Sequence, residues 1–98
     1  MLDVNKVVLD AEIRGSLQET LLLRGAIGAQ RLIVLFSADI LDHWPREIQA
    51  ARLNEMHPFV ESAVKRLLQR RQFSVVGDPV LGDDEAWLVI LSWIDIAS

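Results

Sequence analysis

Three side chains able to bind a metal ion or transfer protons stand close together in the sequence: Asp39, Asp42 and His43. On a helix, Asp39 would share a face with Asp42 and with His43, because residues three and four positions apart are neighbours there. A metal site would need a third or fourth ligand from elsewhere in the chain. We favour the simpler interpretation, in which these side chains cap a short helix and face water.

The other residues that could carry chemistry are few. The chain has no cysteine, no tyrosine and two histidines, which leaves no thiolate nucleophile and no cysteine metal cluster. His57 precedes Pro58 and is interpreted as a helix-junction residue, with a pH switch as the alternative. The acidic segment 78–85 resembles a calcium loop in charge but not in spacing. We predict no catalytic residue, no metal site and no cofactor, and we expect that the protein is not an enzyme.

A basic patch lies in the second half of the chain. Its members are candidate contacts for an anionic partner: Lys65, Arg66, Arg70 and Arg71. Segment 44–73 carries six basic and three acidic residues, a net +3, whereas segment 74–98 carries five acidic residues and no basic one. That asymmetry can steer an anionic partner, although a solvated helix face is the plainer interpretation. Nucleic acid is not expected, because the net charge is −4 and no aromatic residues are interleaved with the basic ones.

Alternation of apolar and polar residues predicts the first strands. Residues 6–14 alternate with a period of two, which is typical of an antiparallel strand with one face in water. A second strand is predicted over residues 19–24, followed by a glycine turn over residues 25–28. The run 31–36 is apolar on both faces, so we expect this third strand to lie centrally in a sheet.

Capping residues and prolines predict the helices. Ser37 is suited to begin a short helix that runs through His43, and Trp44–Pro45 ends it. Residues 46–57 are expected to be helical with weak periodicity, and Pro58 suits the first turn of a new helix. The apolar stripe of this main helix is predicted to be buried, and it consists of Phe59, Val60, Ala63, Val64, Leu67 and Leu68.

Two more strands are predicted, over residues 73–76 and 86–96, with an acidic loop over 77–85 between them. The last strand is apolar on both faces. One row of its side chains is a candidate protein interface because tryptophan is enriched at binding hot spots, and it consists of Trp87, Val89, Leu91 and Trp93. The opposite row holds Leu88, Ile90 and Ile94. The pattern alone does not say which row faces the main helix.

These elements predict an α+β fold: a mainly antiparallel sheet of four to five strands, with one main amphipathic helix and a short helix packed on one face. The 98 residues suit one domain over residues 1–98. The N-terminal residues do not resemble a signal peptide, and no apolar run approaches the ~20 residues of a membrane span. Together with the absence of cysteine, this favours a soluble cytoplasmic protein without a membrane partner.

Residues 22–44 run from Leu22 through the glycine turn and an apolar strand to Ser37-Ala38-Asp39-Ile40-Leu41, which opens the short helix. This order resembles the bacterial domain-of-unknown-function family 1488, in which a longer helix follows, and residues 52–71 are similar to that helix in outline. The resemblance implies a compact bacterial α+β fold and no known activity.

The leading functional hypothesis is a small non-enzymatic bacterial interaction module that acts as a homodimer or binds another protein. It rests on the hydrophobic fraction of 51% and on strands that are apolar on both faces, since such surfaces need cover. The alternative is an accessory or inhibitor protein, encoded by a phage or mobile element, that binds a larger complex through its charged surface.

Overall fold

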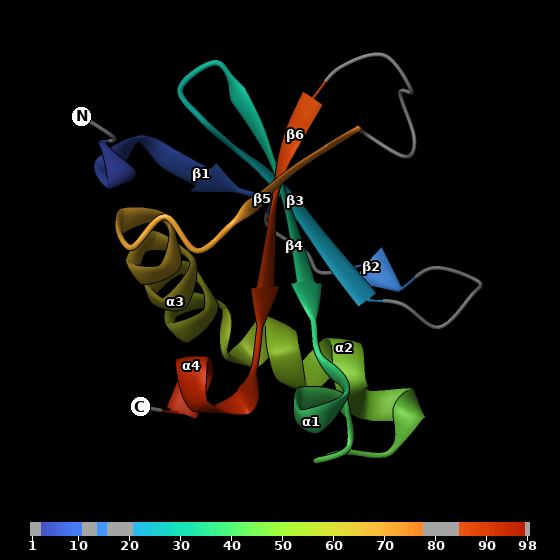
Figure 1. Ribbon diagram of the computed structural model, residues 1–98. Helices are drawn as coiled ribbons and strands as arrows, with labels where there is room; N and C mark the ends of the chain where they lie inside the picture. The colour runs from blue at the N-terminus through green and yellow to red at the C-terminus, as the bar shows by residue number, and fades with distance from the viewer. Residues whose placement is uncertain (1–2, 11–13, 16–20, 78–84, 98) are drawn as a thin grey trace.

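A mixed β-sheet organises the chain in the computed structural model, which describes residues 3–10, 14–15, 21–77 and 85–97 (Figure 1). Its strands are β1 (Val7–Leu9), β2 (Arg14–Gly15), β3 (Leu21–Ile27), β4 (Gln30–Phe36), β5 (Ser74–Gly77) and β6 (Glu85–Leu91). Their order across the sheet is β1-β3-β4-β6-β5, and β2 also pairs with β3. All pairs are antiparallel except β4 with β6. The α+β prediction with a mainly antiparallel sheet is confirmed.

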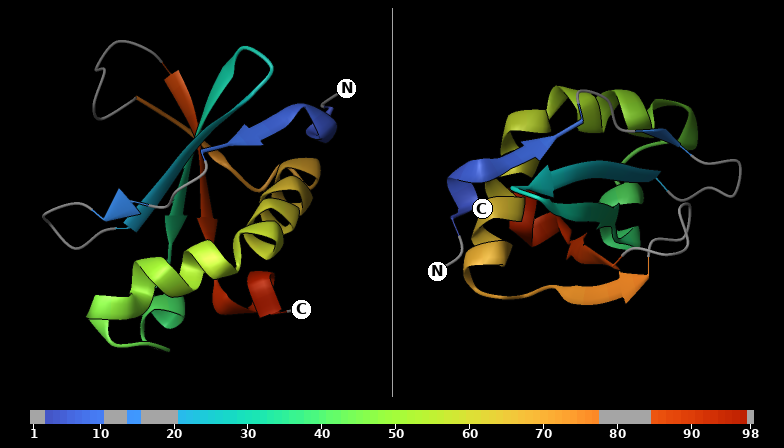
Figure 2. Two further views of the ribbon diagram at one scale, coloured as in Figure 1. Left: turned by 180° about the vertical axis from the view of Figure 1, so that it is seen from behind. Right: turned by 90° about the horizontal axis from the view of Figure 1, so that it is seen from above.

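The helical elements are a 3-10 turn η1 (Val4–Lys6) and the helices α1 (Ala38–Leu41), α2 (Arg46–Glu55), α3 (His57–Gln69) and α4 (Trp93–Ala97). Because β4 and β6 run parallel, the helices that follow them, α1 and α4, emerge at the same end of the sheet, next to α2 (Figure 1). The longest helix, α3, lies beside the sheet in all three views (Figure 2). None of the helices in the described ranges has the length and apolar content to cross a membrane.

The core lies between the helices and one face of the sheet. Alternate residues of the strands enter it, including Leu23, Val34 and Val89, each fully buried. They pack against the apolar stripe of α3 and against one buried residue from each of the other helices: Ile40 of α1, Leu53 of α2 and Ile96 of α4. Ile33 and Ala86 are also buried but stand outside this cluster, since they point to the opposite face. The sheet therefore has a face covered by helices and a second face that none of the described helices covers, here called the open face.

The α3 stripe is confirmed apart from its first member. Val60, Ala63, Val64, Leu67 and Leu68 are buried, at the spacing i, i+3, i+4, i+7, i+8 of an amphipathic helix. Phe59 instead leaves 59% of its surface exposed. Pro58 occupies the first turn of α3, as expected.

The first predicted strand is interrupted. Leu9 pairs with Gly25 and Arg14 pairs with Leu22, so five residue steps on the N-terminal segment lie opposite three on β3. Two extra residues cannot be accommodated in one regular ladder. The single strand over residues 6–14 is therefore wrong, and the predicted inward positions at residues 11 and 13 lie outside the described residues.

The predicted glycine turn is shorter than expected. Gly28, at φ 59°, begins the turn between β3 and β4. Gly25 lies inside β3, where a Cβ atom would stand 2.6 Å from the carbonyl oxygen of Val8 and 2.7 Å from a methyl carbon of Leu9. Gly25 therefore permits the close approach of β1 and does not make a turn.

The last predicted strand ends five residues early, at Leu91, and the chain turns into α4. Ser92 and Asp95 explain the change, because one carboxylate oxygen of Asp95 accepts hydrogen bonds from the backbone N–H and the hydroxyl of Ser92, both at 2.8 Å. The bond from the Ser92 N–H to the Asp95 side chain is one half of a capping box, and the Asp95 N–H bonds the Ser92 carbonyl oxygen at 3.1 Å, so the chain starts a helix here.

Candidate functional site

The carboxylate of Asp39 joins α1 to α4. It accepts a hydrogen bond from the hydroxyl of Ser37 and another, at 3.1 Å, from the backbone N–H of Trp93. The ring Nδ1 of His43 lies 2.7 Å from the Asp39 carbonyl oxygen and so donates to it. Asp42 is exposed at the C-terminal end of α1. These contacts are those of a helix junction, and no group of three or more acidic or histidine side chains in the described part of the chain is placed to hold a metal ion.

Aromatic rings complete the junction of α1 and α4. The His43 ring stacks on the Trp93 ring with their centroids 3.7 Å apart and their planes 17° apart. Trp44 meets Trp93 edge to face at 5.7 Å. Trp93 therefore packs on α1 and the turn after it, and it does not lie in a row with the side chains of β6.

The hydrogen bonds to Asp39 also hold its pKa below the ordinary value of 3.8, the Ser37 hydroxyl more than the Trp93 N–H. Because a lowered folded-state pKa stabilises the fold above the unfolded-state pKa, this contribution is lost as the pH falls below about 4 through the folded-state pKa. We expect an NMR titration of the Asp39 carboxyl to show a midpoint below 3.8, and Ser37→Ala to raise it. A midpoint at or above the ordinary value in the wild type would contradict this.

The members of the candidate row that belong to β6 face the helices: Trp87, Val89 and Leu91. Val89 and Leu91 are fully buried, and Trp87 stacks on Phe73 with centroids 4.4 Å apart. Trp93 belongs to α4. Val89 and Leu91 are therefore part of the core, while Trp87 and Trp93 pack against it and each keeps part of its surface exposed.

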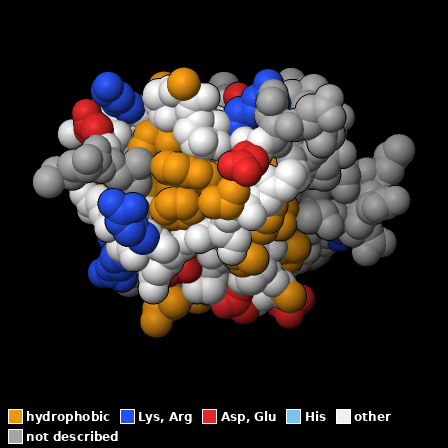
Figure 3. Space-filling view, turned by 45° about the horizontal axis from the view of Figure 1, so that its top comes forward, with side chains coloured by type: hydrophobic (Ala, Val, Ile, Leu, Met, Phe, Trp, Pro, Cys, Tyr) orange, Lys and Arg blue, Asp and Glu red, His pale blue; other side chains and the backbone are white. Residues whose placement is uncertain are grey.

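The opposite side chains of β6 lie on the open face. Ile90 is 57% exposed and Leu88 is half-buried, although β6 has a strand on each side. The strand registers place further apolar side chains on the same face, together with the arginines Arg24 and Arg31; the apolar ones are Val8, Leu22, Ala26, Ile33 and Leu35. Ile94 does not join them, since it lies on α4 at 72% exposure. Figure 3 shows hydrophobic side chains, in orange, gathered at the surface near the middle of that view.

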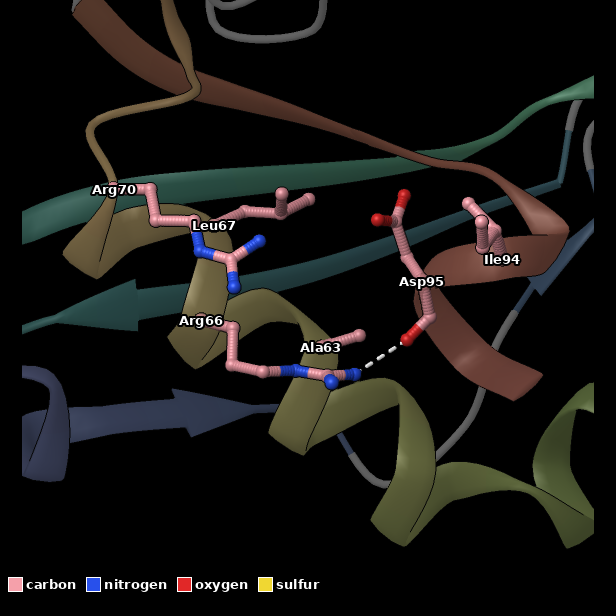
Figure 4. Close-up of a pocket in the computed structure, with 6 residues that line it drawn as sticks. All are labelled: Ala63, Arg66, Leu67, Arg70, Ile94 and Asp95. Carbon is pink, nitrogen blue, oxygen red and sulfur yellow. Dashed lines mark hydrogen bonds between the residues drawn. The ribbon is translucent and has the colours of Figure 1, made fainter. Parts of the chain in front are cut away.

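The structure divides the four predicted basic contacts. Arg66 is half-buried and donates a 2.5 Å hydrogen bond to the carbonyl oxygen of Asp95, which ties α3 to α4. Arg70 is exposed one turn further along α3, and both line a groove of about 280 Å³ (Figure 4). Lys65 and Arg71 do not line it, and Arg71, at φ 55°, ends α3 in the left-handed conformation.

The sequence interpretation missed this groove because it missed α4. Its remaining lining comes from Ala63 and Leu67 on α3 and from Ile94 and Asp95 on α4. The available signal was Ser92 followed three residues later by Asp95, a spacing that marks a helix start. Apolar residues continue beyond Ser92, at positions 93, 94 and 96, so the sequence pattern predicted a longer strand.

Comparisons with models of known protein families, with curated proteins and with solved structures found no match. The resemblance of residues 22–71 to the bacterial domain-of-unknown-function family 1488 therefore stays a prediction. The function has to be inferred from the surfaces themselves.

Proposed function

We propose that this chain is a non-enzymatic interaction module that forms a homodimer through the open face of its sheet. The observation that carries the proposal is Ile90, which is 57% exposed on an interior strand. In a sheet whose second face simply meets water, alternating positions on that face are polar. Here the register places Leu35 on one side of Ile90, directly paired with it, and Leu88 precedes it on the same face of β6.

A second copy of the same face is the simplest cover. Two-fold dimers are the commonest oligomers, and their interfaces are self-complementary. Strands of seven residues such as β4 and β6 are roughly 23 Å long, and five strands side by side span roughly 20 Å. These lengths give a flat area of roughly 460 Å², about half of the ~800 Å² that each partner contributes to a standard interface, so the proposed interface is a small one on a total exposed surface of 6215 Å².

The test is the mass of the protein in solution before and after Ile90→Asp. The wild type is expected to run as a dimer of the 11.1 kDa chain in light scattering at tens of micromolar. Ile90→Asp should raise the dimer dissociation constant by at least about 100-fold, because it removes roughly 1.5–3 kcal/mol of apolar burial per copy and buries a charge. The variant should then be a monomer with an unchanged circular dichroism spectrum.

Val75→Asp is the matched control. Val75 is 56% exposed on a strand but pairs with Trp87, so it lies on the opposite face of the sheet from Ile90. This variant should remain a dimer. A monomeric wild type would refute the homodimer, and loss of the dimer in Val75→Asp but not in Ile90→Asp would place the interface on the other face.

A further inference from the structure

The groove between α3 and α4 combines two cations with an apolar wall. Arg66 and Arg70 come from successive turns of α3, and Figure 4 shows both guanidinium groups on the same side of the groove. Leu67, between them in sequence, and Ile94 on α4 supply apolar surface. Ile94 is 72% exposed at the rim.

The guanidinium groups retain the capacity to bind an anion. One Arg66 nitrogen donates to the Asp95 carbonyl oxygen, and a guanidinium has five N–H donors, so others remain. The Arg70 side chain is exposed and forms no ion pair or hydrogen bond with any described residue. Two arginines close together repel each other, and a carboxylate between them would relieve that repulsion with charge-assisted hydrogen bonds.

Asp95 makes the α4 end of the groove unfavourable for a negatively charged group. One oxygen of its carboxylate is held by Ser92, and the group remains an anion at the α4 side. A second anion is therefore disfavoured there, whereas an aliphatic side chain can contact Ile94 and Leu67. The groove is thus built for a carboxylate at the arginines and an uncharged apolar group toward α4.

We propose that this groove binds a segment of a partner protein in which an acidic residue stands beside an aliphatic one. Charge supports this choice of occupant, because segment 44–73, which includes α3, carries a net +3 within a chain of net −4. A groove of about 280 Å³ is at the small end for a ligand site and suits one or two side chains of a peptide. It lies among the helices, away from the open face, so the inference does not depend on the homodimer.

The test is an NMR titration of the isotope-labelled protein with a capped hexapeptide of sequence Ser-Gly-Asp-Leu-Gly-Ser. We expect the peptide to shift the backbone amides of residues 63–70 and 93–96 and to bind less tightly as sodium chloride is raised from about 0.05 to 0.5 M. Arg70→Gln should weaken binding about tenfold, the loss expected for one charge-assisted hydrogen bond. Peptides with Asn for Asp, or Ala for Leu, should each bind more weakly.

Arg52→Gln is the matched control, because it removes the same charge from α2, where Arg52 pairs with Glu55 at 3.2 Å, outside the groove. This variant should bind the peptide within about twofold of the wild type. Shifts confined to strand residues, equal binding of the Asn peptide, or no shift up to about 5 mM peptide would each overturn the proposal. Acetate alone shifting the same amides as strongly as the peptide would show a site for free anions instead.

Discussion

Replacing Leu68 by alanine is expected to destabilise the protein by about 2–5 kcal/mol, as the deletion of buried leucine side chains does. Leu68 is fully buried where α3 packs against the sheet, so the lost methyl groups leave a cavity that the rigid strands cannot fill. Since a domain of this size has a stability of about 5–15 kcal/mol, the loss is a large part of the total. Urea denaturation followed by circular dichroism measures it.

Phe59→Ala is the control for that substitution. It removes a larger side chain from the same helix, but Phe59 is 59% exposed, and its loss should change the unfolding free energy by about 0.5 kcal/mol or less. All variants are compared at one protein concentration, because dimer formation would make the apparent stability depend on it. A loss below about 0.5 kcal/mol for Leu68→Ala would mean that α3 does not cover the sheet as described.

Replacing Gly25 by alanine is expected to separate β1 from β3. The added Cβ would stand 2.6 Å from the Val8 carbonyl oxygen and 3.2 Å from the Leu9 Cα, and both are backbone atoms that cannot rotate away. We expect a loss of about 1–3 kcal/mol from the overlap, together with faster hydrogen exchange at Asp10, whose N–H bonds the Arg24 carbonyl at 2.8 Å.

Gly77→Ala is the control for the second substitution. Gly77 also lies in a strand, but a Cβ there would meet nothing within 4 Å, and its backbone is not in the left-handed region. The change should leave stability unaltered or raise it by up to about 1 kcal/mol through the unfolded state. Equal losses for the two alanine variants would show that close packing of β1 is not the reason for glycine at position 25.

The two proposed surfaces use opposite layers of the molecule and have different physical signatures. Association through Ile90 and its neighbours removes apolar surface from water and should respond little to salt. Binding at Arg66 and Arg70 is an interaction of exposed charges and should weaken as salt rises. The salt dependence of each assay therefore distinguishes one surface from the other without any mutation.

Local sequence determined the elements whose signals are self-contained. The apolar run of β4 predicted an interior strand, and β4 lies between β3 and β6. Pro58 set the start of α3, because proline fits a first helical turn and no later one. The buried positions from Val60 to Leu68 followed from the helical period alone. The spacing of Ser92 and Asp95 also indicated a helix start at α4, although the apolar residues around them favoured a strand.

Only the tertiary structure decided which side of each strand the helices cover. A period of two is unchanged when a strand is turned over, so the sequence could not choose between the Val89 and Ile90 rows of β6, and the helices filled the Val89 side. Gly25 and the pair of Arg66 and Arg70 depend on neighbours distant in sequence: β1 and α4. The roles of these residues depend on contacts between distant elements, and a local sequence pattern does not predict such contacts.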